Sequence, residues 1–309
     1  MSLFPQSLDE PTYAQLWPDD RHWLDAVRVL AERHGLSAQP VRYRSGTALA
    51  YRLGELVLKL YPPFYAHDCR LEASVLARLN EVADVPSPRH VADGTLEGFR
   101  YLLMTRLPGE PIDLLWPGLA AHLRVELCHS IGVLTRALHG APADALPRPD
   151  PDFAAFRTAM RERALSHHIG RGFAREREAE LAALLEELDG EPEPGAAEVL
   201  LHTELGPGHL LVDQGRISGL FDFAEARRGP AEYDFAAVGL FVTRGDRAAF
   251  AAFLDGYGQP AHLRGPGLVR RLMRHALLHQ YGHLSFYLKA WPAPHSEELW
   301  ALAQHWFAH

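Results

Sequence analysis

The sequence predicts an α+β protein of two lobes, a small β-rich lobe followed by a larger, mostly helical one. Alternating apolar residues and turn glycines fill much of the first third of the chain, which is typical of antiparallel strands. Apolar residues at helical spacing dominate the remainder. The Pro- and Gly-rich segment LPGEPI connects the two regions, so we place the lobes at residues 1–107 and 108–309. A ligand site is expected in the cleft between them.

The composition is that of a globular protein and excludes several other classes. Hydrophobic residues make up 47% and charged residues 23% of the 309 residues, which excludes a disordered or collagen-like chain. The formal net charge of -8 argues against nucleic acid as a partner. No apolar run approaches the ~18 residues that span a bilayer, and the first residues do not resemble a signal peptide. The 2 cysteines provide no disulfide framework. We therefore expect a cytoplasmic monomer without membrane contact.

The elements of the first lobe follow from local signals in the sequence. Asp19 and Asp20 precede a helical stripe that ends at Gly35, which predicts a capped helix. After Pro40, short alternating runs separated by turn residues predict a meander of strands. In order, the further predicted elements are strands at 41–46, 48–54 and 55–61, a helix over 67–81, and strands at 85–94 and 98–107.

The second lobe is predicted to be helical around one β-hairpin. Apolar residues at spacings of three and four predict a helix over 123–138. The other predicted features are a loop at 148–152, a charged helix to about residue 188, a break at 190–195, a hairpin with its turn at 213–215, and helices to residue 309.

Two charged regions give opposite indications about a substrate. Arg271, His275, His279 and His283 recur every four residues and are predicted on one helix, as a polar and basic face. Such a face would suit an anionic or neutral molecule. Residues 176–198 are rich in Glu and would suit a cation, or form a solvated surface. The charge of the substrate stays open at this point.

The segment from residue 199 to 236 carries the residues best suited to chemistry. His202 and Glu204 lie on one side of a Gly-Pro-Gly loop, and His209 follows it. The predicted hairpin then returns Asp222 to the same end, between two phenylalanines. Acidic groups that converge from a loop and a strand end are suited to metal binding and proton transfer. Asp222 is the most secure of these residues, because packing offers no reason for a carboxylate there.

This segment resembles the catalytic core of the aminoglycoside phosphotransferase and choline kinase family, which has a protein-kinase-like fold. That family carries a His-x-Asp-x-x-x-x-Asn loop, then a hydrophobic-Asp-Phe strand end, then a Tyr-Asp-hydrophobic-Ala helix start. The chain has HTELGPGH, LFDF and EYDFAA in that order. The runs GELVLKLY, RLEASVLARL, YLLMTRLPGEPI and LTRALHGAP match the family elsewhere, and TYAQLW and EELWALAQHW faintly resemble its hygromycin phosphotransferase branch.

The resemblance implies a nucleotide site in the first lobe. Lys59, one of only two lysines among 31 basic residues, would hold the phosphates of ATP or GTP, oriented by Glu72. Backbone amides of the turn formed by Ser45, Gly46 and Thr47 would cover the phosphates. Backbone groups of Thr105, Arg106 and Leu107 would contact the nucleobase. The chain has no Walker A motif and no Gly-x-Gly-x-x-Gly run, so this expectation depends on the resemblance.

In the second lobe, the resemblance implies that Glu204, His202 and Asp222 form the catalytic centre. Asp222 would bind a metal ion, and Glu204 would accept the proton of a hydroxyl on a small-molecule acceptor. His202 would place the loop, and His209 would be the second metal ligand. Asp234 would tie the loop to the following helix.

Two residues differ from the family pattern and leave alternatives open. Glu204 replaces Asp and adds one methylene, and His209 replaces Asn. Imidazole is a poor ligand for Mg²⁺ but suits Mn²⁺, so the metal is expected to be Mg²⁺ or Mn²⁺ with a preference for Mn²⁺, or to bind to Asp222 alone. The same substitutions are compatible with a pseudokinase that binds nucleotide or a partner without transfer. Transfer of a nucleotidyl group to a protein hydroxyl is a third, weaker hypothesis.

Overall fold

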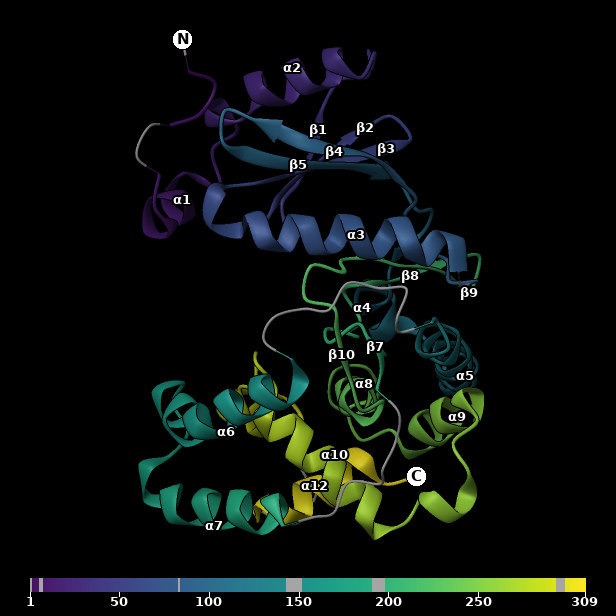
Figure 1. Ribbon diagram of the computed structural model, residues 1–309. Helices are drawn as coiled ribbons and strands as arrows, with labels where there is room; N and C mark the ends of the chain where they lie inside the picture. The colour runs from purple at the N-terminus through teal and green to yellow at the C-terminus, as the bar shows by residue number, and fades with distance from the viewer. Residues whose placement is uncertain (1, 6–7, 83, 143–151, 191–197, 293–297) are drawn as a thin grey trace.

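The structure is a computed structural model that describes residues 2–5, 8–82, 84–142, 152–190, 198–292 and 298–309. It has two lobes (Figure 1). One antiparallel sheet with strand order β1-β2-β3-β5-β4 organises the first lobe. Its strands are β1 (Val41–Tyr43), β2 (Leu49–Leu53), β3 (Leu56–Tyr61), β4 (His90–Leu96) and β5 (Phe99–Thr105). The strands predicted from the sequence are all present, although each is shorter than expected, and β4 begins five residues later than predicted and extends to Leu96.

Helices cover both faces of this sheet (Figure 1). α2 (Leu24–Arg33) packs on one face and α3 (Ala66–Val82) on the other, toward the second lobe. Successive side chains of a strand point to opposite faces. Leu58 and Leu60 of β3 accordingly belong to the core under α2, whereas Tyr61 belongs to the core beside α3. The central strands are therefore buried on both sides.

The N-terminal segment differs from its prediction. A helix α1 (Glu10–Leu16), which the sequence analysis did not predict, precedes the 3-10 turn η1 (Asp20–His22), and α2 begins only at Leu24. Asp19 caps η1 by accepting a hydrogen bond from the Arg21 N–H. The single predicted helix is broken because Trp23 has a φ of -124°, outside the helical region.

The second lobe is helical around two small sheets, β6-β8-β9 and β10-β7. The predicted hairpin is present as β8 (Leu210–Asp213) and β9 (Arg216–Leu220). The other strands of the second lobe are β6 (Glu110–Pro111), β7 (Val199–Leu201) and β10 (Arg227–Gly229). The helices of this lobe are α4 (Ile112–Leu115), α5 (Ala121–His139), α6 (Phe153–Gly170), α7 (Glu178–Asp189), α8 (Glu232–Ala237), α9 (Arg247–Tyr257), α10 (Pro266–Leu278), α11 (Leu284–Ala290) and α12 (Leu299–Phe307). Short 3-10 turns lie at η3 (Trp116–Gly118), η5 (Arg175–Arg177) and η7 (Ala261–Leu263), and η6 (Val238–Thr243) is π-helical.

Two helix predictions are wrong. The charged helix expected up to residue 188 is two helices, because α6 ends at Gly170 and α7 begins at Glu178. The helix expected to carry four basic residues at intervals of four ends at Leu278. Of the predicted loop at 148–152, only Asp152 is among the described residues. Of the predicted break at 190–195, only Gly190 is among them. No helix among the described residues is long and apolar enough to cross a membrane.

The closest helix contact joins α5 and α9 through two glycines. A Cβ built on Gly132 would lie 2.1 Å from the Phe253 carbonyl oxygen, and one on Gly256 would lie 2.0 Å from the His129 carbonyl oxygen. Real Cβ atoms do not approach backbone oxygen this closely. The two helix backbones therefore meet directly, and only glycine is compatible with this spacing.

We predict that Gly132→Ala destabilises the protein, because the methyl group would force α5 and α9 apart in a tightly packed core. Overpacking of this kind costs about 1–3 kcal/mol of unfolding free energy. Denaturant unfolding of the purified variant would measure it. Gly170→Ala is the matched control, because nothing lies within 4 Å of a Cβ at the end of α6. Equal stability of both variants would contradict this packing.

Candidate active site

Lys59 faces the second lobe because of its register in β3. Its neighbours Leu58 and Leu60 point into the core under α2, so Lys59 points to the opposite face, as Tyr61 does. The side chain of Lys59 is only 8% exposed. A buried ammonium needs partners that carry negative charge.

Glu72, on α3, is the first of these partners. The Lys59 Nζ donates to both carboxylate oxygens of Glu72 at 2.9 Å. The Tyr61 hydroxyl also donates to this carboxylate, and the backbone N–H of Phe223 donates to it at 3.3 Å. Glu72 is fully buried. Its carboxylate thus joins a strand of the first lobe to the segment that follows β9 in the second lobe.

Asp222 is the second partner of Lys59. The Nζ donates to its Oδ1 at 2.9 Å. Burial alone would raise the pKa of Asp222, but the charge and hydrogen bond of Lys59, together with the nearby His209 and His202, outweigh burial and lower this pKa to about 2. The two carboxylates in turn raise the pKa of Lys59 despite its burial. Both groups are therefore charged at neutral pH. Asp222 has a φ of 73°, the left-handed conformation, which is strained for a residue with a side chain.

The loop between β7 and β8 carries the other candidate residues, and Asp234 of α8 holds it. The Asp234 carboxylate accepts the backbone N–H of His202 at 2.8 Å and that of Thr203 at 2.9 Å. His139, at the end of α5, contacts the same carboxylate at 3.1 Å. Thr203 is also left-handed, with a φ of 69°. The predicted structural role of Asp234 agrees with these contacts.

His202 supports the loop through its ring. Its Nε2 donates to the Phe221 carbonyl oxygen at 3.0 Å, which links the loop to the segment that carries Asp222. The Nδ1 is buried without a hydrogen-bond partner among the described residues. Burial, with the nearby His209, lowers the pKa of His202 to about 4, so the ring is neutral at pH 7.

His209 is oriented toward Asp222. Its Nδ1 lies 2.8 Å from the Glu204 carbonyl oxygen. A carbonyl oxygen only accepts hydrogen bonds, so Nδ1 carries the proton and Nε2 has a free electron pair when the ring is neutral. This Nε2 lies 4.0 Å from the Asp222 Oδ2. One imidazole nitrogen and one carboxylate thus face each other. Among the described residues, no three His, Cys, Asp or Glu side chains are gathered into a complete metal site.

Glu204 has the electrostatics of a proton acceptor. Burial and the nearby Asp222 and Glu225 raise the pKa of its carboxyl group to about 7, against the opposing effect of His209 and Lys59. A carboxyl group with a pKa near neutrality is matched to general base catalysis.

The residues predicted to contact the nucleotide lie around the first-lobe sheet. Ser45, Gly46 and Thr47 form the exposed turn between β1 and β2, and Gly46 has a φ of 86° that suits glycine. At the end of β5, the Thr105 N–H already bonds to the Arg89 carbonyl oxygen at 2.9 Å.

The segment after β5 leaves one amide for a ligand. The Arg106 N–H donates to the Glu55 carbonyl oxygen at 2.8 Å, and that of Thr105 is used as well. The Leu107 N–H has no partner among the described residues. Of the three residues predicted to contact the base, Leu107 is therefore the one with a free donor.

Three residues around Glu225 were not predicted from the sequence, namely Asp68, Gln280 and Tyr281. The Tyr281 hydroxyl donates to Glu225 at 3.2 Å, and the Gln280 amide donates to the same carboxylate at 3.4 Å. Asp68, at the start of α3, faces them from the first lobe, and burial together with Glu225 raises its pKa to about 6. No sequence signal brings residues 68, 225 and 281 together, because three separate elements carry them.

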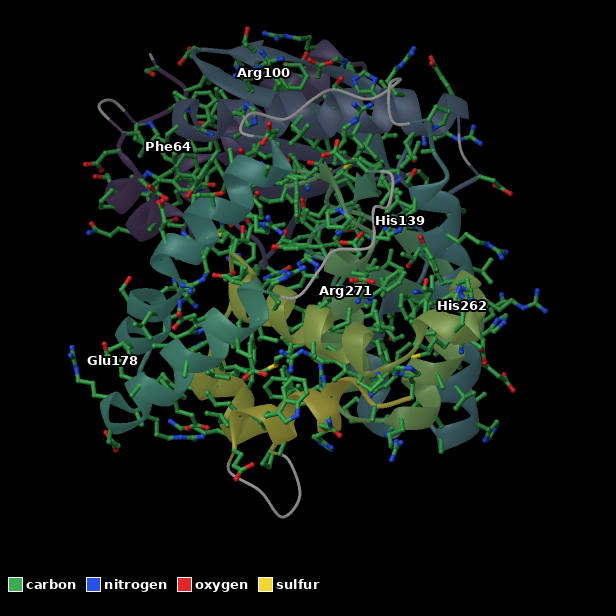
Figure 2. The ribbon with its side chains drawn as sticks, turned by 60° about the horizontal axis from the view of Figure 1, so that its bottom comes forward. Phe64, Arg100, His139, Glu178, His262 and Arg271 are labelled. Carbon is green, nitrogen blue, oxygen red and sulfur yellow. The ribbon has the colours of Figure 1, made fainter. Side chains whose placement is uncertain are left out.

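The predicted basic face on α10 is not present. His275 and His279 are buried, and burial lowers their pKa to about 3 and about 4, so both are neutral. His279 donates to the Thr203 carbonyl oxygen at 2.9 Å, beyond the end of the helix. Arg271, among the helices of the second lobe in Figure 2, forms a bidentate ion pair with Glu232 at 2.7 and 2.9 Å. The indication of an anionic substrate therefore disappears.

Three carboxylates of the Glu-rich region are engaged in ion pairs. On and beside α7, Glu180 pairs with Arg177, Glu187 with Arg270, and Asp189 with Arg161. The last two pairs join α7 to α10 and to α6. Because arginines neutralise these three carboxylates, they give no indication of a cationic ligand.

Comparisons with known proteins agree with this fold. The chain is similar in structure to the aminoglycoside phosphotransferase APH(4)-Ia, with a TM-score of 0.62 and 18% identity over 91% of this chain and 98% of that one. It is similar to an aminoglycoside-3'-phosphotransferase of type VIII, with a TM-score of 0.61 and 25% identity over 82% and 97%. It is similar to the macrolide 2'-phosphotransferase MphH from Brachybacterium faecium, with a TM-score of 0.58 and 24% identity over 91% and 97%.

These likenesses confirm the two-lobed, protein-kinase-like fold that the sequence resemblance implies. A model of a protein family, described as the phosphotransferase enzyme family, matches residues 38–270, which is most of the chain. The Lys59–Glu72 pair, the loop with Glu204 and the Asp222 strand end all lie within this match. The chain is a member of the phosphotransferase enzyme family.

Proposed function

We propose that this protein transfers the γ-phosphoryl group of ATP or GTP to a hydroxyl of a small molecule. The observation that carries the proposal is the position of Lys59, held 2.9 Å from both Glu72 and Asp222 across the two lobes. Lysine paired with a helix glutamate, next to an aspartate at a strand end, is the charge arrangement that phosphotransferases use to hold a nucleotide and its metal. A related phosphotransferase of known structure was crystallised with ADP and hygromycin B.

On the nucleotide side, each residue has a defined task. Lys59 would bind the phosphates, with Glu72 fixing its ammonium. The amides of the turn at 45–47 would cover the phosphates, and the free N–H of Leu107 would bind the base. Asp222 and the Nε2 of His209 would hold a divalent cation, Mg²⁺ or Mn²⁺, whose remaining ligands are phosphate oxygens and water. The bound cation supplies neutralisation of the charge that develops on the phosphates.

On the acceptor side, Glu204 would act as the general base. The acceptor hydroxyl oxygen forms a bond to the γ-phosphorus while the bond from that phosphorus to the β–γ bridging oxygen breaks, and the proton passes to Glu204. The products are a phosphate ester and a nucleoside diphosphate. Glu225 lies near Glu204, and Asp68 lies near Glu225, so these carboxyl groups would favour a neutral or cationic acceptor over an anionic one.

The pseudokinase alternative is favoured by Glu204 and His209, the two departures from the family pattern. Both hypotheses include nucleotide binding, so binding alone does not separate them. A nucleotide that binds, together with no product on a broad panel of aminoglycosides, macrolides and other hydroxyl compounds, would favour the pseudokinase. Formation of a phosphorylated product would exclude it.

We predict that Glu204→Gln lowers kcat by about 10²–10⁴-fold, because an amide cannot accept the proton. Nucleotide affinity should stay within about threefold of wild type, since Lys59 and Asp222 are retained. Glu81→Gln, on the exposed end of α3, is the control and should leave both quantities unchanged. Release of nucleoside diphosphate with the best acceptor of the panel measures kcat, and calorimetry measures affinity. A Glu204→Gln variant with wild-type turnover would exclude Glu204 as the base.

The raised pKa of Glu204 also predicts a pH dependence. The base must be deprotonated, so kcat/KM should rise with pH with a midpoint near 7. The folded state favours the protonated form of the Glu204 carboxyl. The contribution of this group to the free energy of unfolding is therefore present at low pH and is lost as the pH rises through about 7. Glu204→Gln should therefore stabilise the protein at pH 8 by about 1–3 kcal/mol and have little effect at pH 4. Thermal melts at both pH values test this, and a destabilised variant at pH 8 would contradict it.

His209 leads to a prediction about the metal. Turnover at saturating metal should be higher with Mn²⁺ than with Mg²⁺, because imidazole nitrogen binds Mn²⁺ better. His209→Asn replaces this nitrogen with an amide oxygen and should shift the ratio toward Mg²⁺ by about tenfold, if one ligand bond of about 1.4 kcal/mol changes. His122→Asn, on the surface of α5, is the control. Equal turnover of wild type with both metals would refute the preference.

A further inference from the structure

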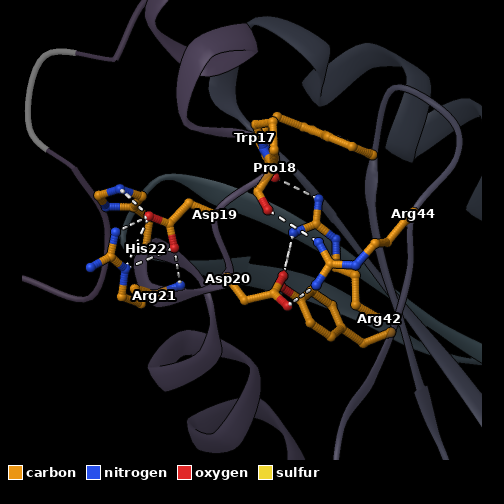
Figure 3. Close-up of polar contacts among 9 residues, drawn as sticks. Trp17, Pro18, Asp19, Asp20, Arg21, His22, Arg42 and Arg44 are labelled. Atoms are coloured by element: carbon orange, nitrogen blue, oxygen red, sulfur yellow. Dashed lines mark hydrogen bonds and ion pairs between the residues drawn. The ribbon is translucent and has the colours of Figure 1, made fainter.

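The chain before residue 38 lies outside the family match, yet it contacts the turn that would cover the phosphates. Figure 3 shows this contact, in which the side chains of Arg42 and Arg44 reach Trp17, Pro18 and Asp20. We call the contacts made by Tyr13, Trp17, Pro18 and Asp20 to this hairpin the N-terminal brace.

Asp20 is the centre of the brace. Its Oδ1 accepts a hydrogen bond from Arg42 at 2.6 Å, and its Oδ2 accepts one from Arg44 at 2.9 Å. Arg42 lies in β1, and Arg44 is the first residue after that strand. The side chain of Arg42 is only 3% exposed, and its guanidinium stacks 4.4 Å from the Trp17 ring and donates to the Trp17 carbonyl oxygen. A buried guanidinium depends on its carboxylate, so one aspartate fixes the base of the turn.

The tip of the turn is held at a second point. The Tyr13 hydroxyl donates to the Thr47 carbonyl oxygen at 2.8 Å, and Tyr13 is itself buried against Trp23. Between these two points α1 does not pack tightly against the turn. A groove of about 260 Å³, lined in part by Ala14 of α1 and Gly46 of the turn, lies between α1 and the turn. The polar contacts of Asp20 and Tyr13 thus hold the turn at its base and at its tip.

We propose that Asp20 and Tyr13 are positioning residues that hold the backbone amides of residues 45–47 within hydrogen-bond distance of the nucleotide phosphates. This inference rests on the proposed function, because it concerns the same nucleotide. Amide donors contribute only when they lie within hydrogen-bond distance of the phosphate oxygens, so a displaced turn loses that contribution. The nucleoside would be bound elsewhere, at Leu107, and does not depend on the turn. The brace therefore acts on phosphate binding alone.

The test compares a nucleotide with its nucleoside on the full chain. Calorimetry would measure the Kd of ATP with Mg²⁺ and the Kd of adenosine, or of GTP and guanosine if the wild type binds GTP better. Asp20→Asn removes the charge of the brace while keeping its size. Asp19→Asn is the matched control, because Asp19 pairs with Arg21 and does not contact the turn. Tyr13→Phe removes only the hydrogen bond to Thr47 and leaves the buried ring in place.

Asp20→Asn and Tyr13→Phe should each weaken ATP binding by about 3- to 10-fold and leave adenosine binding within twofold of wild type. Asp19→Asn should change neither. If Asp20→Asn does not fold, Tyr13→Phe decides the question. ATP affinities within twofold of wild type for the folded variants would overturn the brace, and so would an equal loss for ATP and adenosine, which indicates general damage. A wild-type protein that binds no nucleotide would instead overturn the proposed function, and the brace with it.

Discussion

The arrangement of this molecule depends on the buried carboxylate of Glu72. It accepts hydrogen bonds from the Lys59 ammonium and the Tyr61 hydroxyl of the first lobe, and from the Phe223 N–H of the second. A carboxylate without such partners would not stay ionised in the interior. Because its three partners come from both lobes, the same contacts that stabilise the charge also set the distance between β3 and the segment after β9. Lys59 reaches Asp222 only when that distance is kept.

A second buried carboxylate, that of Asp234, fixes the loop between β7 and β8. It binds two successive backbone N–H groups, those of His202 and Thr203. Thr203 and Asp222 both adopt left-handed backbone conformations, which cost of order 1 kcal/mol or more for residues other than glycine. Such conformations persist when surrounding contacts impose them. Here the contacts of Asp234, His202 and Lys59 impose them and direct Glu204, His209 and Asp222 toward one another.

Where the sequence-based predictions were wrong, the cause is a tertiary contact that no local pattern records. The periodic spacing of His275, His279 and His283 is real, but α10 ends at Leu278, and the His279 ring bonds to Thr203 in the loop that follows β7. Burial then makes His275 and His279 neutral, so residues that would form a basic face in an exposed helix do not supply charge. Likewise Asp20, expected to cap a helix, binds Arg42 and Arg44 of the first-lobe hairpin.

The sequence by itself determined the five strands of the first lobe, the hairpin of the second, the two-lobed architecture and the identity of the candidate residues, because strand alternation, helical periodicity and the spacing of His202, Glu204, His209 and Asp222 are local properties of the chain. Only the tertiary structure decided which groups meet and what charge they carry. The nearness of Asp68 and Glu225, the raised pKa of Glu204 and the Leu107 N–H, which is unpaired within the described part of the chain, depend on burial and on distances between elements far apart in sequence. Electrostatic interactions depend on those distances and on the exclusion of water, which the fold alone provides.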